Sequence, residues 1–311
     1  MLSRVADTIY WLARYMERTQ SMLQVIRTNY IASQDEIRHF SWRPLLYAYG
    51  ELIQDEISQV ERNTPKVLEH LILDKSNHAS AYNNILQGRE NARAVQDHIT
   101  KEVWQCLNDY YHLVRDEDLA RQIKFGDPIS GIDLLMRNSV IFTGVVKNTM
   151  TRDESYAYIN IGKFLERAIQ VADIIRIKWA GVSHDDQQTM ETPELRYLLY
   201  SLFGYEFFLK TYKGNFSPDN ALQQVVYNTY FPHSLLYCLN QLSRYFERLK
   251  EEGLSDSFEQ VEFLIGKVKN EVKYSHFTNE DPEALNNFLL QVRNELFGVA
   301  AAFSKYYFGN S

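Results

Sequence analysis

Apolar residues near the start of the chain recur in alternating steps of three and four positions. The seam they form consists of Leu2, Val5, Ile9, Leu12, Met16, Leu23 and Ile26. Residues three or four places apart lie on the same face of an α-helix, so this spacing predicts one long amphipathic helix. A second stripe, near the other end, consists of Leu285, Leu289, Val292, Leu296 and Val299. The pattern therefore predicts long helices at both ends of the chain.

Helices are predicted throughout, because the residues that break them are scarce. The chain has only 13 glycines and 7 prolines among its 311 residues, and no segment shows the period of two that marks a strand. The predicted helices are 3–32, 43–58, 65–74, 78–98, 101–114, 130–149, 152–180, 193–213, 218–229, 233–251, 255–273 and 282–307. We expect an all-α fold, a multi-helix bundle of about ten to twelve helices with no sheet. It forms a single domain over residues 1–311, or two lobes with a hinge near 181–191.

Several predicted helices begin with a recognisable cap. The pairs Thr192-Pro193, Ser217-Pro218 and Asp281-Pro282 each place a capping side chain before a proline, and an acidic residue follows each proline. The capping oxygen accepts from an unpaired amide, proline needs no amide there, and the acid favours the positive end of the helix. Thr151 and Glu154 have the spacing of a capping box, which predicts another helix start.

One seven-residue pattern occurs three times. It reads LARYMER at 12–18, IGKFLER at 161–167 and LSRYFER at 242–248. Every copy has an aliphatic, a small, a basic, an aromatic and an apolar residue, followed by Glu and Arg. The copies begin 149 and then 81 residues apart, so the chain is not a solenoid with a fixed period. We interpret the pattern as one type of helical segment that occurs three times in the fold.

The charged residues of the first copy form a strip beside the apolar seam. Arg14 and Arg18 are four residues apart, Glu17 lies three after Arg14, and Tyr10 lies one turn before it. The corresponding charged residues are Lys163, Glu166 and Arg167 in the second copy, and Arg244, Glu247 and Arg248 in the third.

Two interpretations of these strips remain open. In the first, Glu and Arg form ion pairs between packed helices. In the second, several strips converge on a polar pocket that binds an anionic group, because guanidinium meets carboxylates and phosphates with two hydrogen bonds. The matched chemistry of the first two copies predicts that their helices pack together and bring Arg14, Glu17, Lys163 and Glu166 into one cluster.

The segment 89–93 carries similar chemistry at a different spacing. Arg89 and Arg93 share one helix face, and Glu90 and Asp97 extend the ladder of charges. A solvated helix face is the simplest interpretation. The segment is also a candidate part of the polar cluster.

Composition narrows the class of protein. The net charge is −7 and the pI about 5.7, which gives no electrostatic support for binding nucleic acid. The two cysteines, Cys106 and Cys238, form neither a disulfide framework nor a metal-ligand cluster, as in a reducing cytosol. The opening segment is charged, and the most apolar stretch, 195–209, is short and contains two charges. We therefore expect a cytoplasmic protein that does not span a membrane.

The motifs that mark common cofactor enzymes do not occur. The sequence has no glycine-rich phosphate loop, no GxSxG elbow and no dinucleotide fingerprint. We therefore predict no bound cofactor and no metal site.

Three segments together resemble a known family. They are YWLARYMER at 10–18 after the opening MLSRVA, RENAR at 89–93 followed by Trp104, and TRDE at 151–154 leading into FLER at 164–167. In these residues, and over nearly its whole length, the chain resembles the bacterial alpha-E domain family, helical proteins with a Glu-Arg motif. The segment FPHS at 231–234 departs from the commoner FPRS, so no ligand role is assigned to His233.

The resemblance implies a role in ATP-dependent peptide synthesis or modification. The family is associated with circularly permuted ATP-grasp proteins and with transglutaminase-like proteins, which are the implied partners, and a peptide is a further candidate. The resemblance assigns no catalytic residue. We therefore expect an accessory helical protein without independent activity, whose Glu/Arg cluster receives an anionic ligand or a partner.

Two other functions fit the same residues. A stand-alone enzyme would use Glu17, Glu166 or Asp153 as acid or base, with Arg14, Arg18 and Arg167 holding an anionic peptide or another anionic substrate. A purely structural scaffold would pair these charges separately. A shared site requires Glu17, Arg18, Arg89, Glu90, Glu166 and Arg167 to converge on one cavity that solvent can reach.

Overall fold

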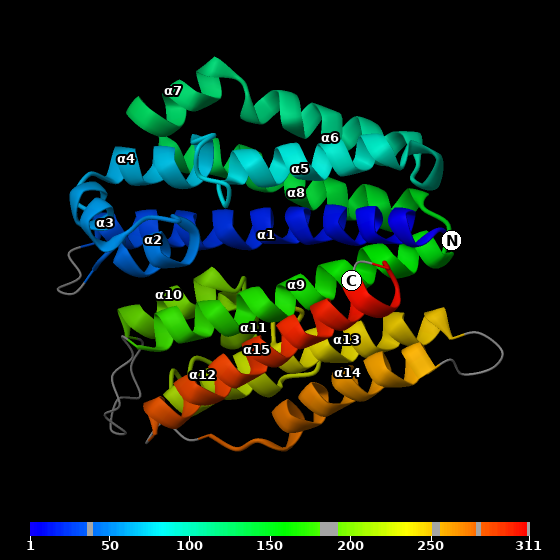
Figure 1. Ribbon diagram of the computed structural model, residues 1–311. Helices are drawn as coiled ribbons and strands as arrows, with labels where there is room; N and C mark the ends of the chain where they lie inside the picture. The colour runs from blue at the N-terminus through cyan, green and yellow to red at the C-terminus, as the bar shows by residue number, and fades with distance from the viewer. Residues whose placement is uncertain (36–39, 181–191, 251–255, 278–280, 310–311) are drawn as a thin grey trace. The chain divides into compact units, whose positions relative to one another are not determined.

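Every regular element that the structure describes is helical (Figure 1). The structure is a computed structural model and describes residues 1–35, 40–180, 192–250, 256–277 and 281–309. The all-α prediction is confirmed. These ranges contain fifteen α-helices rather than ten to twelve, with two π-helices and two 3₁₀ turns between them.

The chain divides into two compact units. The N-terminal unit is Trp11–Thr151, and the C-terminal unit comprises Met1–Tyr10 and Arg152–Ser311. Helix α1 (Ser3–Gln34) begins in one unit and continues into the other. The hinge predicted at 181–191 lies outside the described residues.

The N-terminal unit contains most of α1 and nine shorter elements. They are α2 (Arg43–Tyr49), α3 (Gln54–Val60), α4 (Thr64–Leu68), the π-helix η1 (Glu69–Leu73), α5 (Ala81–Ala94), the 3₁₀ turn η2 (Gln96–His98), α6 (Lys101–Val114), α7 (Glu117–Phe125) and α8 (Pro128–Thr149). Helix α6 packs against α5 and α8, and α7 packs against α8 and α4. Gly88 lets α5 approach α1 closely, since a Cβ atom there would lie 2.5 Å from Met16 Cε.

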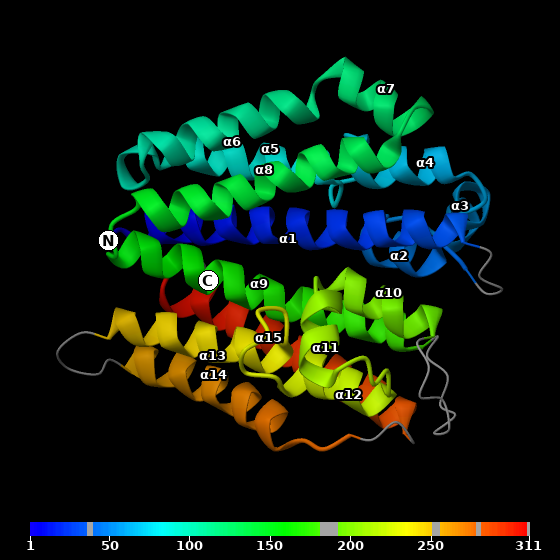
Figure 2. The same ribbon diagram turned by 180° about the vertical axis from the view of Figure 1, so that it is seen from behind.

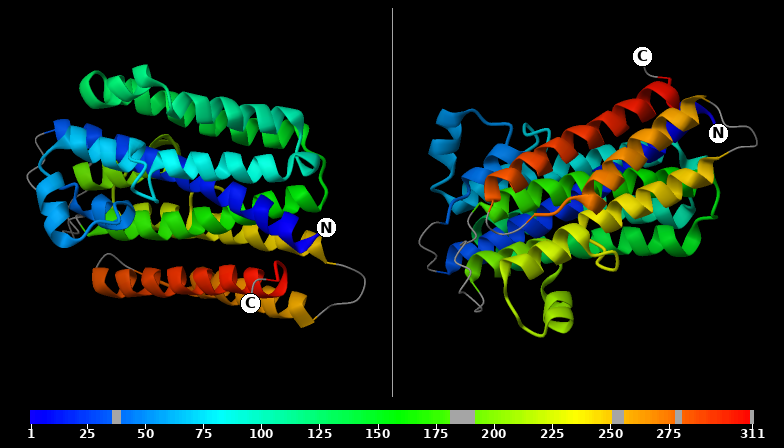
Figure 3. Two further views of the ribbon diagram at one scale, coloured as in Figure 1. Left: turned by 45° about the horizontal axis from the view of Figure 1, so that its top comes forward. Right: turned by 90° about the horizontal axis from the view of Figure 1, so that it is seen from below.

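The C-terminal unit is built on α9 (Glu154–Trp179), which is buried on nearly all sides. The other elements are α10 (Pro193–Ser201), α11 (Tyr205–Tyr212), α12 (Pro218–Leu222), the π-helix η3 (Gln223–Tyr227), α13 (Leu235–Phe246), the 3₁₀ turn η4 (Glu247–Leu249), α14 (Asp256–Tyr274) and α15 (Pro282–Tyr306). Helices α13 and α15 pack along α9, and α14 packs against both of them (Figure 2, Figure 3).

The two units repeat one order of elements. Each has a long helix, two short helices, and a helix that continues as a five-residue π-helix; three further helices follow, and α7 has no counterpart. Corresponding caps lie 154 residues apart: Ser80 and Ser234 cap α5 and α13, and Asp127 and Asp281 cap α8 and α15. The fold therefore uses one helical module twice, an organisation that the irregular spacing of the seven-residue pattern did not reveal.

Three differences account for the higher helix count. The predicted helix 43–58 is two helices, because the chain turns at Gly50 and Glu51, whose φ is 51°. The predicted helix 193–213 is also two, with Phe203 between them at φ 57°. The stretch 115–129, predicted as a loop, contains α7, which begins after the capping residue Asp116 and buries Leu119 and Ile123.

Three of the four predicted helix starts are confirmed. The side chains of Thr192, Ser217 and Asp281 each accept a hydrogen bond from the backbone amide three residues ahead. The capping box predicted at Thr151 is wrong. Asp153 is the cap instead, since its Oδ1 accepts from the amide of Tyr156 at 3.1 Å and α9 begins at Glu154.

Helix α8 is the one helix among the described residues whose length and composition would allow it to cross a membrane. The prediction that 195–209 is the most apolar stretch is therefore wrong. Length and composition alone place α8 in this class, and 33% of its apolar window is buried inside the structure. Asp133, in the second turn of α8, pairs with Arg27 of α1.

Candidate functional site

The second copy of the pattern places charged side chains at a buried position. Glu166 is 1% exposed and Arg167 6% exposed, while Lys163, one turn earlier on α9, is half-buried. Gln170 Nε2 donates to Glu166 Oε1 at 3.1 Å. An uncompensated buried charge is strongly unfavourable, so these groups need hydrogen-bond or ion-pair partners in the folded chain.

Arg167 links this strip to the loop that precedes α13. Its Nη1 donates to the Pro232 carbonyl oxygen at 3.4 Å. Burial lowers the pKa of the neighbouring His233 well below its usual value, and the positive charges of Arg167 and Lys163 lower that pKa further. The imidazole is therefore neutral at pH 7 and lies in a positive field. We call Lys163, Arg167 and His233 the cationic cluster.

His233 lies beside Lys163 and Arg167 in the folded chain, which lower the pKa of its imidazole. The sequence analysis assigned it no ligand role, and whether its imidazole binds a ligand stays a prediction. Its ring lies 5.0 Å from that of Phe203, the residue with a left-handed backbone.

The third copy packs against the second through its aromatic residue. The ring of Tyr245 stacks on that of Phe164 at 5.8 Å with an interplanar angle of 11°. Arg244, Glu247 and Arg248 are exposed, because α13 ends at Phe246 and the last two residues of the pattern fall in η4. The third copy therefore supports the packing of α9 and leaves its own charges at the surface.

The first copy has its buried charges in the N-terminal unit. Arg14 and Glu17 are each 3% exposed, and Arg14 lies over the Trp11 ring at 4.5 Å. Arg18 is half-buried and lies 5.9 Å from the Tyr15 ring. The meeting of Arg14 and Glu17 with Lys163 and Glu166 stays a prediction.

Tyr10 lies one turn before Arg14 on α1. It is 1% exposed, with its ring 5.8 Å from that of Phe303 and 5.1 Å from that of Phe308. Asp153 caps α9, as described above. Both residues thus have a structural role.

Arg89 is held between α5 and α6. Its guanidinium lies 5.1 Å from the Trp104 ring and 5.0 Å from the Tyr111 ring, and it donates to Asn108 Oδ1 at 3.1 Å. Glu90 pairs with Arg89 at 2.5 Å and with Arg93 at 2.7 Å. The Arg93 side chain is 62% exposed, so this segment is a partly solvated ladder whose charges pair with one another.

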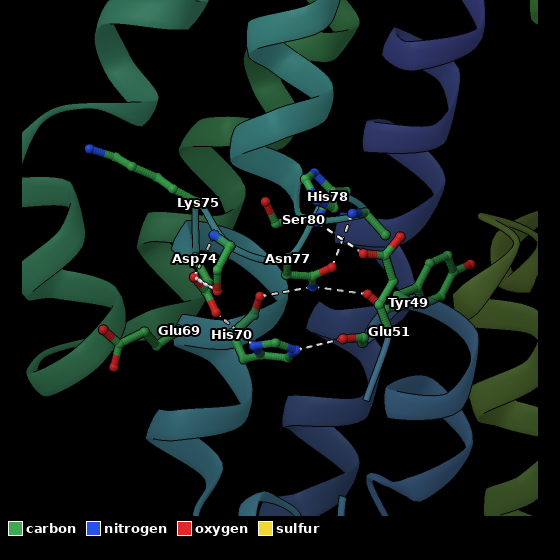
Figure 4. A network of polar contacts seen from close by, with 12 residues as sticks. Tyr49, Glu51, Glu69, His70, Asp74, Lys75, Asn77, His78 and Ser80 are labelled. Atoms are coloured by element: carbon green, nitrogen blue, oxygen red, sulfur yellow. Dashed lines mark hydrogen bonds and ion pairs between the residues drawn. The ribbon is translucent and has the colours of Figure 1, made fainter. Parts of the chain in front are cut away.

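A polar network that the sequence did not predict joins η1 to the turn between α2 and α3 (Figure 4). His70 contacts Asp74 Oδ2 through Nδ1 and the Gly50 carbonyl oxygen through Nε2, both at 2.8 Å. Asn77 Nδ2 donates to the carbonyl oxygens of Tyr49 and His70. Burial opposes ionisation of Asp74, but hydrogen bonds from Ser76 and His70 hold its pKa below the usual value.

The C-terminal unit uses neutral residues at the same two positions. Gln224 and Asn228 lie 154 residues after His70 and Asp74, and Gln224 Nε2 donates to the Gly204 carbonyl oxygen at 2.8 Å. Gly204 in turn lies 154 residues after Gly50. Because both units close this turn in the same way, the network in Figure 4 has a structural function in the module.

Metal binding and thiol chemistry find little support in the described ranges. They contain no group of three or more His, Cys, Asp or Glu side chains that could hold a metal ion. Cys106 is buried, and burial together with the nearby Asp109 charge raises the pKa of its thiol to about 11. Its thiol is therefore protonated at pH 7 and a poor nucleophile.

Comparison with known proteins identifies the family. The model of the Alpha-E family, described as a predicted alpha-helical domain with a conserved ER motif, matches residues 1–308. The chain therefore belongs to the alpha-E family. No solved structure gives a significant match.

Similar curated proteins occur in mycobacteria. The uncharacterized protein Mb2597 of Mycobacterium bovis and the uncharacterized proteins MT2643 and Rv2567 of Mycobacterium tuberculosis are each 20% identical to this chain over 318 aligned positions. The alignments cover 96% of this chain but 35% of each relative. The chain thus spans about a third of the length of the curated relatives it matches.

Proposed function

We propose that this alpha-E protein is an accessory binding module that acts beside a circularly permuted ATP-grasp ligase in peptide synthesis or modification. In this proposal the cationic cluster receives a carboxylate or phosphate group of the peptide or of the partner. A transglutaminase-like protein is a second expected partner. The cytoplasm is the expected compartment.

The observation that supports the proposal is the placement of Lys163 and Arg167 on one strip of α9 beside the loop that contains His233. Arg167 Nη1 donates to the Pro232 carbonyl oxygen at 3.4 Å, and both cations lower the pKa of the His233 imidazole. A guanidinium and an ammonium group can bind an anionic group through charge-assisted hydrogen bonds. Arginine and a neutral histidine together offer charged and uncharged hydrogen bonds to its oxygen atoms.

The length of the relatives supports an accessory role. In three mycobacterial proteins, a segment similar to this chain makes up 35% of the whole. A module that occurs joined to a longer chain is suited to work with neighbouring domains or with a separate partner. The identity of that partner as an ATP-grasp protein rests on the family association.

The test is a binding measurement with matched variants. Calorimetry of the purified chain with a circularly permuted ATP-grasp protein from the same organism compares Lys163→Gln with Arg248→Gln, which removes an exposed charge of the third copy. We expect Lys163→Gln to weaken binding by about tenfold, roughly the value of one charge-assisted hydrogen bond, and Arg248→Gln to leave it unchanged. Equal affinity of the two variants would remove the cationic cluster from the binding site, and no binding by the unaltered chain would contradict the partnership.

A further inference from the structure

A strip of alternating arginine and aromatic side chains lies where α5 packs against α6 in the N-terminal unit (Figure 1). The Arg89 guanidinium lies 5.1 Å from the Trp104 ring and 5.0 Å from the Tyr111 ring. Arg115, directly after α6, lies 5.1 Å from the Tyr111 ring and donates to its hydroxyl at 2.9 Å. The arginine–aromatic strip consists of Arg89, Arg93, Trp104, Asn108, Tyr111 and Arg115.

The Arg89 guanidinium is held in one orientation. Trp104 and Tyr111 are seven residues apart on α6, so their rings are separated by about 10 Å along the helix and the guanidinium lies between them. Its Nε and Nη2 donate to Asn108 Oδ1 at 3.3 Å and 3.1 Å, and its Nη1 donates to Glu90 Oε1 at 2.5 Å. A group that is fixed in advance loses little side-chain entropy when it binds a partner.

The strip keeps hydrogen-bond donors that the described chain does not use. A guanidinium carries five N–H groups, and the three bonds to Asn108 and Glu90 leave Arg89 one N–H on each terminal nitrogen. Trp104 is half-buried, and its indole N–H makes no hydrogen bond among the described residues and is not enclosed. The Tyr111 hydroxyl accepts from Arg115 and keeps its own hydrogen for a further acceptor.

The charge of the strip is positive in an acidic chain. Its three arginines are offset by one carboxylate, Glu90, which pairs with both Arg89 and Arg93. The two acidic residues of α6, Glu102 and Asp109, are exposed at positions at least about 100° round the helix from the aromatic residues of the strip. Donors and positive charge together select a negatively charged acceptor.

The repeated module shows that helix packing does not require these residues. Counted from the caps Ser80 and Ser234, the residue of α13 that corresponds to Arg89 is Ser243. Its hydroxyl accepts from Lys269 Nζ of α14 at 3.2 Å and donates to Glu247 Oε1 at 3.2 Å. Helix α13 thus packs against α14 with a serine where α5 has an arginine. The strip is therefore a feature of the N-terminal unit and not of the module.

The length of the strip selects the kind of partner. Trp104 and Arg115 are eleven residues apart, which corresponds to about 16 Å along the helix. That distance is too long for one small anion, but it matches about five residues of an extended peptide, at about 3.3 Å per residue. Tryptophan, tyrosine and arginine are also the residues that contribute most often to the binding energy of protein interfaces.

We propose that the arginine–aromatic strip binds an acidic peptide segment in an extended conformation. Its carboxylates accept from the terminal nitrogens of Arg89, from the Trp104 indole and from Arg115. The proposal does not rest on the proposed function, because the strip lies in the N-terminal unit and the cationic cluster in the C-terminal unit.

Fluorescence anisotropy at low ionic strength, where charge contacts are least screened, measures this binding with the full chain. The probes are a labelled peptide with five consecutive glutamates, the same peptide with five glutamines, and a labelled oligodeoxythymidine. Arg115→Gln removes an exposed guanidinium from the strip, and Trp104→Phe removes the indole donor while keeping a ring beside Arg89. Arg121→Gln is the matched control, because the Arg121 side chain is 70% exposed on α7 and lies outside the strip.

The indole N–H signals of the ¹⁵N-labelled chain locate the site. Trp42 is an internal control because its Nε1 donates to Thr64 Oγ1 at 3.2 Å. We expect the glutamate peptide to move the Trp104 signal downfield in a saturable manner and to leave the Trp42 signal in place. Arg115→Gln and Trp104→Phe should each weaken binding by about tenfold, whereas Arg121→Gln and Lys163→Gln should leave it unchanged.

Four outcomes would overturn the proposal. They are a Trp104 signal that does not move at millimolar peptide, equal affinity for the glutamine peptide, tighter binding of the oligonucleotide than of the glutamate peptide, and equal losses in Arg115→Gln and Arg121→Gln. A loss in Lys163→Gln without one in Arg115→Gln would place the peptide at the cationic cluster instead. If Trp104→Phe does not fold, Arg115→Gln and the comparison of probes on the unaltered chain still decide.

Discussion

At the residue scale, packing between distant parts of the chain determines the environment of the charged side chains on α9. Glu166 and Arg167 are almost completely buried. Lys163 and Arg167 lie more than sixty positions before His233 in the chain and become its neighbours through the packing of α13 along α9. The environment of a loop residue such as His233 therefore depends on elements that are far away in the sequence.

The lowered pKa of Asp74 predicts that the stability of the fold depends on pH. Its pKa is lowered in the folded chain, so ionised Asp74 stabilises the fold at neutral pH, and this contribution is lost as the pH falls through the folded pKa. We expect Asp74→Asn to reduce the free energy of unfolding by about 1 kcal/mol at pH 7, a modest value because the group is partly exposed. The difference from the unaltered chain should shrink toward zero in acid.

Urea melts at a series of pH values measure this effect. Asp118→Asn is the matched control, because the Asp118 side chain is 84% exposed and pairs with Arg121 at the surface. A constant difference between Asp74→Asn and the unaltered chain across the acidic range would show that the ionised form of Asp74 has no special stability.

The buried thiol of Cys106 gives a prediction about reactivity. Since burial raises its pKa to about 11, almost no thiolate exists at pH 8, and we expect iodoacetamide to modify Cys106 far more slowly in the native chain than in urea. Mass spectrometry of timed reactions measures the rate. Complete modification of native Cys106 within the time needed by a free peptide thiol would show that the residue is open to solvent.

At the scale of elements, the sequence predicted which segments are helical, but it did not predict where two of these helices are interrupted. The helix 101–114 was predicted with the bounds that the structure shows. The breaks at Glu51 and Phe203 escaped because both residues adopt a left-handed backbone without being glycine or asparagine. Tertiary contacts hold such residues in the left-handed conformation, so the local sequence does not predict it.

Two glycines in the N-terminal unit, Gly88 of α5 and Gly144 of α8, predict opposite effects of substitution. A Cβ atom at Gly88 would meet the Met16 side chain, whereas one at Gly144 would meet nothing within 4 Å. We expect Gly88→Val to destabilise the chain by about 1–3 kcal/mol through overpacking. Gly144→Ala should stabilise it by about 0.5–1 kcal/mol, since alanine loses less backbone entropy in a helix.

Thermal or urea unfolding of both variants checks this pair. Gly298→Ala is a further control, because Gly298 occupies the position in α15 that Gly144 occupies in α8 and also has open space around it. Stabilisation by Gly88→Val would contradict the close approach of α5 to Met16 of α1, and a large loss in Gly144→Ala would contradict the open space around Gly144.

On the scale of the whole molecule, the repeated module explains why the seven-residue pattern has irregular spacing. The first two copies lie in α1 and α9, the long helices that open the two halves of the sequence, and the third lies in α13, whose counterpart α5 carries the segment 89–93. The sequence contained a signal for this repeat in its Asp-Pro pairs at 127–128 and 281–282. Only the pair at 281–282 was interpreted, as a single helix start, and the helix that follows the pair at 127–128 was predicted to begin at 130.

The whole chain gives the last prediction, which separates the accessory function from the enzymatic one. We expect the purified chain to show no ATP hydrolysis and no peptide ligation by itself, since no phosphate-binding loop occurs in the sequence and Glu166 is 1% exposed and bonded to Gln170. An acid or base must reach its substrate, which this burial opposes. Activity should appear only when the ATP-grasp partner is added.

The assay measures phosphate release with ATP, Mg²⁺ and candidate amino acids, first for the chain alone and then with the partner. Glu17→Gln and Glu166→Gln are the informative variants, because each keeps the shape of the side chain and removes its charge. Circular dichroism confirms that each variant is folded. Turnover by the isolated chain that is lost in either folded variant would establish an enzyme, whereas stimulation of the partner that survives in both would place the function in the binding surface rather than in these carboxylates.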